Sequence, residues 1–352
     1  MSKEEELYKK IKKLPINRRN KYLYKVTKIL IEGKNYNVKI IDNFFTFSVE
    51  QNKIRQFIEL YFKILEDVYK KEARASQSIG ILIKYMPDTI KFLYSKSNIE
   101  TMHVEIFFKK MEILLERYGF SKRRIHQEKF KYYVHIGMWE KSFKCFTKWM
   151  NEPIDEKFIN LGIEEADRAY YYFLIGDRQT GKHIYDSVET GLLIDKNLKI
   201  ETTPRNLKYQ IEGGDLEGAI QKAITIYKMT QKKERYLLLN SELMKIIFLY
   251  KESMAFEIWR REYLNYLSTP NEFDKFHFGV GTYLLYRSFI KNKKSSKQTM
   301  KMKRVIEEMY KIQEKYDLKN KNTHFKEEIF FWENIYQAIE LYQNITLNKE
   351  EG

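Results

Sequence analysis

The chain has 352 residues and a formal net charge of +16, because 64 Lys and Arg residues outweigh 48 Asp and Glu residues. Hydrophobic residues make up 43% of the sequence, which is enough to offset the entropy lost on folding and excludes disorder throughout. Only five Pro and 14 Gly residues argue against a turn-rich β-sandwich or barrel, and the single Cys145 excludes both an intramolecular disulfide framework and a Cys-based zinc site.

The N-terminal sequence Met-Ser-Lys-Glu-Glu-Glu lacks the apolar segment of a secretory signal. The most apolar stretch, residues 236–250, is interrupted by Asn240, Glu242 and Lys245, so it is too polar for a membrane span. We therefore expect a cytoplasmic protein without a membrane partner.

Residues 1–86 are predicted to form an N-terminal helical region. It opens with basic helical stretches such as LYKKIKKL and RRNKYLYKVTKILIEG. We expect helix or loop rather than a hairpin over residues 36–47, because no second strong strand signal accompanies them. Ser48 followed by Gln51 resembles a capping box, which predicts that a helix begins at Ser48.

Residues 87–270 contain five segments with one shared pattern. In each segment aromatic or aliphatic residues come first, a break follows, and an apolar-periodic run comes after it. The breaks are spaced by about 39 residues, a period of the length that is typical of helical repeats. They fall at Ile99, Gly137, Gly176, Gly214 and Met254.

The residues 5, 9 and 12 positions after each break are small or apolar in every copy. Offsets of 4 and 3 place them on one face of a helix, so we expect that face to be buried. Each unit is therefore interpreted as a helix, a short turn and a second helix, and neighbouring units must stack to bury both faces. The residues concerned are Val104, Phe108, Met111; Ser142, Phe146, Trp149; Gly181, Tyr185, Val188; Ala219, Ala223, Ile226; and Trp259, Tyr263, Tyr266.

This pattern resembles the tetratricopeptide-repeat (TPR) superfamily, with Gly176-Asp177 and Gly214-Asp215 matching its inter-helix turn well and Gly137 in part. The break at Met254 does not match, and Ile99 matches only by spacing. The resemblance implies an all-α, right-handed superhelix whose first helices line a concave wall. The family's ligand-facing offsets fall on Arg124, Gln127, Lys131, Tyr170, Lys208, Met244 and Phe248.

The C-terminal segment, residues 271–352, is predicted to hold one further repeat and capping helices. Residues 283–290 are expected to form its first helix, residues 291–299 a loop, and a second helix is expected from Met300. The stretch FKEEIFFWENIYQAIELY is expected to be a final helix that caps the array.

Two motifs suggest chemistry but have simpler explanations. The segment from Gly176 to His183 approaches a phosphate-binding loop, but His183 replaces the hydroxyl residue that would bind Mg²⁺. Arg178 and His183 have the R-x4-H spacing of helical HEPN ribonucleases, which motivates ribonuclease activity as a minor alternative. The repeat register accounts for both glycines without a nucleotide, because Gly176 is the turn and Gly181 a small packing position.

Six histidines without an HExxH pair or a cysteine partner give no metal signature, and Cys145 is expected to be a structural thiol. Basic clusters at the N-terminus, at residues 122–124 and at residues 291–304 motivate nucleic-acid binding as an alternative function. Solvated lysine-rich helix faces are the preferred explanation, because Lys is common all along the chain.

The preferred hypothesis is a non-enzymatic regulator or binding module without a cofactor. A wall of Arg, Lys and aromatic residues suits an acidic peptide or protein segment with apolar anchors. For Tyr170 and Phe248 the alternative is packing within the array. The Lys, Ile, Asn and Tyr bias is compatible with an AT-rich bacterial genome.

Overall fold

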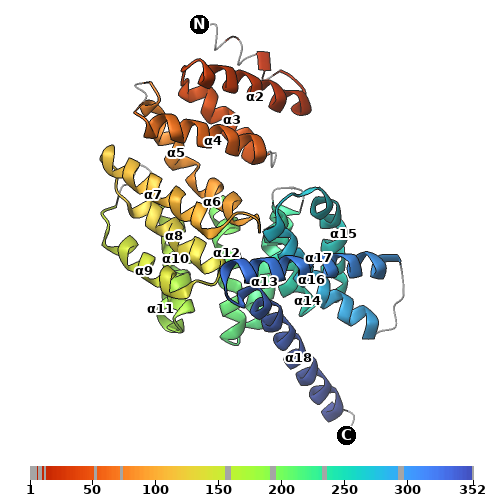
Figure 1. The fold of residues 1–352 in the computed structure, drawn as a ribbon. Coiled ribbons are helices and arrows are strands. Elements are labelled where there is room, and N and C mark those ends of the chain that lie inside the picture. Colours follow the sequence, from red (N-terminus) through yellow and green to blue (C-terminus); the bar gives the residue numbers. More distant parts are fainter. Residues whose placement is uncertain are drawn as a thin grey trace.

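The computed structural model is all-α: its described residues form 17 α-helices and one short 3-10 helix, without a strand (Figure 1). It describes residues 6, 10–11, 13–50, 54–71, 74–154, 160–190, 196–231, 236–291 and 297–350. The helices are α2 (Ile16–Glu32), α3 (Val38–Glu50), α4 (Ile54–Tyr69), η1 (Ser76–Ser78), α5 (Ile79–Lys84), α6 (Met86–Tyr94), α7 (Thr101–Arg117), α8 (Arg123–His135), α9 (Trp139–Asn151), α10 (Leu161–Leu174), α11 (Arg178–Thr190), α12 (Lys196–Glu212), α13 (Leu216–Thr230), α14 (Leu237–Phe248), α15 (Glu252–Ser268), α16 (Glu272–Lys291), α17 (Lys297–Asn320) and α18 (His324–Glu350).

Consecutive helices from α8 to α17 pack as pairs, as the repeat pattern predicted. The turns within the first three pairs contain Gly137, Gly176 and Gly214, whose φ angles are 71°, 85° and 90°. This left-handed backbone is strained for any residue with a Cβ, which explains glycine at these breaks.

An aspartate directly after two of these glycines starts the second helix. Asp215 Oδ1 accepts a hydrogen bond of 2.9 Å from the backbone N–H of Gly218, and Asp177 Oδ1 accepts one of 3.1 Å from Thr180. Such caps satisfy N–H groups that have no partner within the helix. The Gly-Asp motif therefore specifies the turn by local chemistry alone.

The predicted packing positions confirm the repeat register. All residues at the three offsets after the breaks are buried, except Tyr263, which is half-buried. Gly181 is small for a steric reason, because a Cβ there would lie 2.9 Å from the ring of Phe173 and 3.1 Å from the carbonyl oxygen of Ala169.

Two predicted boundaries are wrong. Ser48 does not begin a helix, because α3 continues through it to Glu50 and buries its side chain completely; residues 51–53, including Gln51, lie outside the described part. Met254 is not at the break of the fifth pair, because α14 ends at Phe248 and α15 begins at Glu252. This turn lacks a glycine, so its position had no local signal.

The helical N-terminal region is confirmed for its described residues, and residues 36–47 are mostly helical in α3. One hydrophobic cluster includes residues from Ile11 to Trp332 and joins the N-terminal helices to α12–α18. A second, smaller cluster of Phe130, Val134, Phe146 and Trp149 lies between α8, α9 and α10. In the C-terminal segment two further predicted boundaries are wrong, because α16 begins at Glu272 and α17 at Lys297, both earlier than expected. Residues 291 and 297–299 of the expected loop are therefore helical, and residues 292–296 lie outside the described part.

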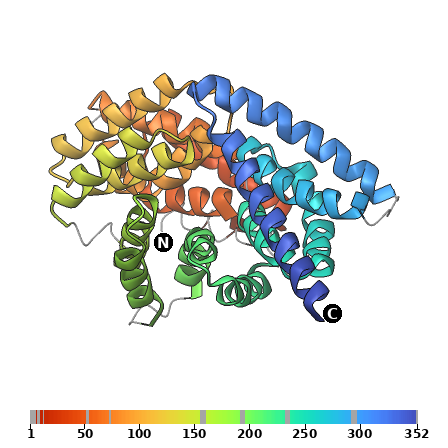
Figure 2. The same cartoon turned by 90° about the horizontal axis from the view of Figure 1, so that it is seen from below.

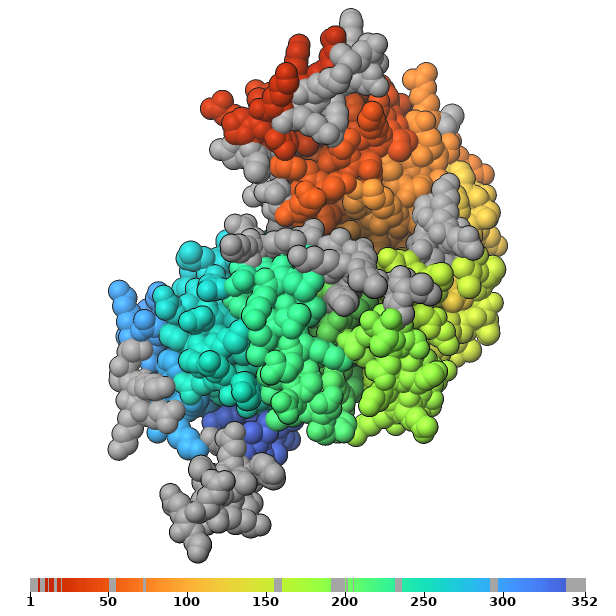
Figure 3. Space-filling model, turned by 180° about the vertical axis from the view of Figure 1, so that it is seen from behind, coloured from red at the N-terminus to blue at the C-terminus, as the bar shows by residue number. Residues whose placement is uncertain are grey.

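The two ends of the paired region meet. The Tyr316 hydroxyl in α17 donates a 2.7 Å hydrogen bond to the carbonyl oxygen of Tyr94 in α6, although 222 residues separate them. The backbone N–H of Glu272 donates to the Ser95 carbonyl at 3.0 Å, and the Glu272 carboxylate accepts from the Ser97 N–H at 2.6 Å. Figure 3 shows the chain running from the N-terminal helices through the green α11–α13 region to the cyan and blue C-terminal pairs.

The last helix, α18, does not pack only on the preceding pair. Seen from below in Figure 2, it runs as the dark blue helix diagonally past the C-terminal pairs. It contacts α12, α14 and α16 through pairs such as Lys208–Glu328, Phe248–Tyr336 and Phe276–Phe325. In the described part of the chain no helix is long and apolar enough to cross a membrane.

Candidate partner-binding face

All seven residues predicted to bind a partner lie on the first helices of successive pairs. Arg124, Gln127 and Lys131 are on α8, and the others follow on α10, α12 and α14. The structure separates them into two groups, one between α8 and α10 and one beneath α18. The second group consists of Lys208, Met244 and Phe248, while Tyr170 packs against Tyr209 of α12 with ring centroids 5.6 Å apart.

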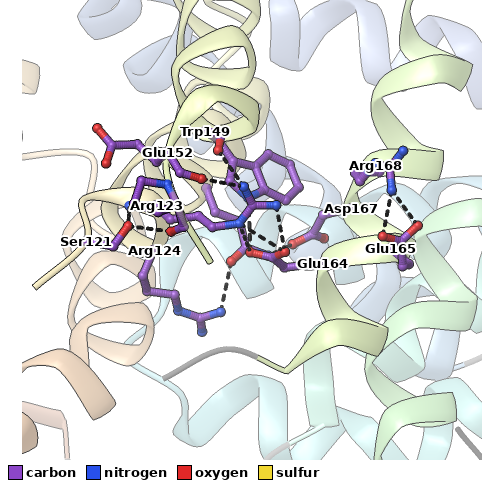
Figure 4. A network of polar contacts seen from close by, with 11 residues as sticks. Ser121, Arg123, Arg124, Trp149, Glu152, Glu164, Glu165, Asp167 and Arg168 are labelled. Atoms are coloured by element: carbon purple, nitrogen blue, oxygen red, sulfur yellow. Dashed lines mark hydrogen bonds and ion pairs between the residues drawn. The ribbon is translucent and has the colours of Figure 1, made fainter. Parts of the chain in front are cut away.

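The interface of α8, α9 and α10 is organised by a buried ion pair (Figure 4). The Arg123 guanidinium donates from Nε at 3.0 Å and from Nη2 at 3.0 Å to the Glu164 carboxylate, a two-pronged arrangement that fixes both side chains. Its Nη1 donates to the carbonyl oxygens of Trp149 and Glu152. The Trp149 indole N–H donates to Glu164 at 3.1 Å, so one carboxylate joins three helices.

The three predicted residues of α8 lie beside this pair and are matched by carboxylates of the chain itself. Gln127 is fully buried and donates to Asp167 at 2.7 Å. Lys131 Nζ lies 2.5 Å from Glu128 and 3.8 Å from Asp167, and Arg124 lies 3.3 Å from Glu128. An acidic ligand at this surface would therefore compete with Glu128 and Asp167 for the two cations.

The second group is covered by α18. Lys208 forms a 2.9 Å ion pair with Glu328, and its Nζ lies 3.7 Å from the ring centroid of Phe331. Phe248 packs against Tyr336 with ring centroids 5.3 Å apart and the rings tilted by 39°. Met244 is fully buried and lies against Gly281 of α16. In this structure a helix of the chain occupies the part of the face formed by α12 and α14.

A buried charge cluster lies at the centre of this contact. Lys245 of α14 has a side chain that is 0% exposed, and its ammonium lies 2.7 Å from Glu242 and 3.1 Å from Glu328. His277 Nδ1 of α16 lies 2.7 Å from Glu242, and the Trp332 indole N–H donates to Glu328 at 2.7 Å. With Lys208 of α12, which also pairs with Glu328, four helices contribute charged or polar groups to this cluster.

The carboxylates of this cluster are held ionised. Burial alone raises the pKa of the Glu328 carboxyl, but the ammonium groups of Lys208 and Lys245 outweigh it and hold the pKa well below its usual range. Burial also opposes ionisation of Glu242, and Lys245 and His277 again lower the pKa overall. Burial lowers the pKa of His324 at the start of α18, which favours its neutral form.

Glu242, His277 and Glu328 are close enough together to suggest a metal site, with ligand atoms within 4.8 Å of one another. The donor set does not fit a metal ion, because the Lys245 ammonium contacts both carboxylates and already supplies the positive charge. The two carboxylates balance the charges of Lys208 and Lys245. The cluster is an ion-pair network rather than a metal centre.

In the segment that resembled a nucleotide or ribonuclease site, Gly181 and Arg178 make contacts within the fold. Gly181 packs against Phe173, as described above, and Arg178 Nη1 donates at 3.0 Å to the carbonyl oxygen of Glu212 at the end of α12. His183 is exposed on α11, five positions from Arg178, and five residues turn a helix by about 500°, which places the two on different sides. Burial raises the pKa of the Cys145 thiol to about 11, which makes it a poor nucleophile.

The basic clusters are partly neutralised. Lys122 pairs with Glu116 at 2.7 Å, Arg123 is buried, and Arg124 pairs with Glu128. In the cluster at residues 291–304, Lys293 and Lys294 lie outside the described residues, and Lys301 lies 5.1 Å from the ring centroid of Tyr263.

The residues that the sequence reasoning missed are those that join α18 to the face, chiefly Glu242, Lys245, Glu328 and Trp332. A signal existed, because Asn240, Glu242 and Lys245 interrupt the most apolar stretch of the chain. Asn240 also proves to be fully buried, and its amide donates to Glu262 at 2.8 Å. Polar residues in such a stretch indicate buried partners elsewhere in the fold.

Comparison with known proteins identifies no relative. No family model matches the chain, and neither a curated protein nor a solved structure matches it. The fold therefore defines only a class: the protein is all-α and is built from paired helices.

Proposed function

We propose that the chain is a non-enzymatic binding protein of the TPR-like kind, a cytoplasmic regulator whose α8, α10, α12 and α14 line a right-handed superhelical wall. Its ligand is a protein or peptide segment, and it needs no cofactor. The Gly-Asp turns, the regular succession of helix pairs and the buried positions at fixed offsets support this proposal.

The observation that carries the proposal is the seating of α18 across the first helices. Aromatic rings and one carboxylate of α18 lie against Lys208, Lys245 and Phe248. A surface that accommodates one amphipathic helix in this way has the chemistry to bind a helical segment from another protein. The cations on α8 extend the same chemistry toward the N-terminal pairs.

The experiment compares the proteins recovered from cells by the tagged wild-type chain and by Arg124→Glu/Lys131→Glu. The matched control is Lys144→Glu/Lys148→Glu, which makes the same charge change at exposed positions of α9. We expect a partner that is lost only in the α8 variant, with circular dichroism showing that both variants stay helical. Unchanged recovery in the α8 variant would contradict a binding role for this face.

Nucleic-acid association is a second candidate function, and one observation favours it. Arg18, Lys21 and Lys25 are all exposed at spacings of 3 and 4 on α2, with Tyr22 (51% exposed) among them. These cations could contact phosphates, in which case affinity falls steeply with salt. Fluorescence-polarisation titrations with single-stranded RNA and duplex DNA at several salt concentrations test this. Binding that is absent, or that does not weaken as salt rises, would contradict this second function.

We do not extend the proposal to a HEPN-like ribonuclease. Arg178 already binds the end of α12, and His183 lies on another side of α11.

A further inference from the structure

Helix α18 presents a distinct pattern to the face that it covers. Phe325, Glu328, Phe331 and Trp332 are spaced by three or four residues, so they share one side of the helix. Phe325 is 2% exposed and Trp332 is 0% exposed, whereas Phe330 on the other side is 49% exposed. The helix therefore offers a carboxylate framed by aromatic residues three positions before it and three and four positions after it.

The face is complementary to this pattern in charge as well as in shape. Without α18, Lys208 would lose its ion pair with Glu328, and Lys245 would keep Glu242 as its carboxylate partner. An occupant that buries the Lys245 ammonium again without supplying a second carboxylate would leave its charge undercompensated, so this face prefers an occupant with a carboxylate at the position of Glu328.

The contact also departs from the rule of repeat arrays, in which each unit contacts only its neighbours. Lys208 and Glu328 are 120 residues apart in sequence. At its start, α18 reaches the α8–α9 turn, where Asn322 donates to the Ile136 carbonyl at 2.7 Å and the His324 ring lies against Trp139. The C-terminal end of α18 projects from the body (Figure 1), so the helix is anchored through its first half.

We infer that α18 is an exchangeable resident ligand, and that the face of α12, α14 and α16 binds an amphipathic helix of a partner protein with a glutamate in the same aromatic frame. The partner helix displaces α18, so binding is autoinhibited. This inference rests on the proposed binding function and names the ligand class for it.

Gly137 provides a variant that loosens α18 without changing the face. A Cβ at Gly137 would lie 2.4 Å from the Cβ of His324, so Gly137→Ala pushes the start of α18 away. Gly176→Ala is the matched control, because Gly176 has a similar φ of 85° but nothing lies within 4 Å of a Cβ there.

The probe is a fluorescently labelled peptide with the sequence of residues 325–339, titrated against each full-length chain. We expect Gly137→Ala to bind it at least about tenfold more tightly than wild type or Gly176→Ala, because the open face is more populated. Replacing Glu328 of the peptide by Gln, or adding Lys208→Met to the Gly137→Ala chain, should weaken binding at least about tenfold. Absent binding, equal binding to all three chains, or no effect of the Gln peptide would overturn the inference.

Hydrogen exchange on the wild-type chain gives a second measurement that does not depend on a variant folding. If α18 is exchangeable, its backbone amides exchange through local opening before those of α14 and α16. Exchange of α18 only together with α14 would identify it as a fixed cap. The peptide experiment and the partner-recovery experiment can give different answers. If no chain binds the peptide but partner recovery still depends on Arg124 and Lys131, the proposed binding function is retained and the proposed role of α18 is wrong.

Discussion

At the scale of single residues, several buried charges of the described interior are held in ion-pair networks. Arg123, Glu164 and Lys245 are all buried, and each contacts at least two groups from other helices or turns of its own helix. Such networks contribute little net stability compared with apolar packing, but they are costly to break, and they can fix the register of the elements they join.

The Arg123–Glu164 pair gives a direct test of this cost. Glu164→Ala leaves the Arg123 guanidinium buried without its carboxylate, so we expect the free energy of unfolding to fall by about 3–5 kcal/mol. Glu165→Ala is the neighbouring control, because its pair with Arg168 is about one-third exposed and is worth at most about 1 kcal/mol. Urea denaturation of both variants measures the difference, and equal losses would contradict a structural role for the buried pair.

The sequence could predict these residues only in part. Asn240, Glu242 and Lys245 stood out as polar interruptions, but nothing in the sequence paired Lys245 with Glu328. For Arg124, Gln127 and Lys131 the resemblance predicted the helix face, and Glu128 is a partner on the same helix. Their partner Asp167, in contrast, depends on how α8 packs on α10. Partner choice is a tertiary property, and a sequence pattern does not specify it.

At the scale of elements, turns that carry a local sequence signal were predicted at the correct positions. The turns with Gly176-Asp177 and Gly214-Asp215 were predicted because a left-handed glycine and a capping aspartate are local features. The turn between α14 and α15 was misplaced because it has neither. The existence of α18 was predictable, but its seating across α12 and α14 was not.

The docking of α18 should weaken in acid. The pKa of Glu328 and Glu242 is lowered in the folded chain, so their contribution is complete above the ordinary carboxyl value of 4.5 and is lost as the pH falls below it. The pKa of His324 is also lowered, below 6.5, so acidification begins to oppose folding already from about that pH.

Unfolding free energies at pH 7, 5.5 and 4 test this expectation. Wild type should lose stability at each step, most steeply below the carboxyl range. Glu328→Gln should be less stable at pH 7 and lose less between pH 5.5 and 4, because the titrating group is gone. The same acid dependence in both chains would show that Glu328 does not hold α18.

At the scale of the whole molecule, the contact between α6 and the α16–α17 pair joins regions that no sequence periodicity relates. Tyr94 packs edge-on against Phe273, with ring centroids 5.0 Å apart, and Tyr316 reaches the carbonyl oxygen of Tyr94. A repeat pattern predicts contacts between neighbouring pairs. It does not predict whether the first and last pairs meet, because that depends on small rotations accumulated over every pair.

Tyr316→Phe tests this long-range contact. It removes a buried hydrogen bond of 2.7 Å and keeps the ring, so we expect a loss of about 1 kcal/mol in the free energy of unfolding. The Glu272 amide, which donates to Ser95, should exchange faster with solvent. Tyr310→Phe is the control at a 39% exposed position of α17, and it should change neither quantity.

The meeting of Tyr94 with Tyr316 has a consequence for biosynthesis. A nascent chain emerges N-terminus first, so α6 leaves the ribosome long before the residues that complete its environment have been translated. The helix pairs between them are translated first, but this contact cannot form until Tyr316 has left the ribosome. Ribosome-bound chains stopped before residue 316 should therefore be cut more readily by proteases near residues 94–97 than the released protein.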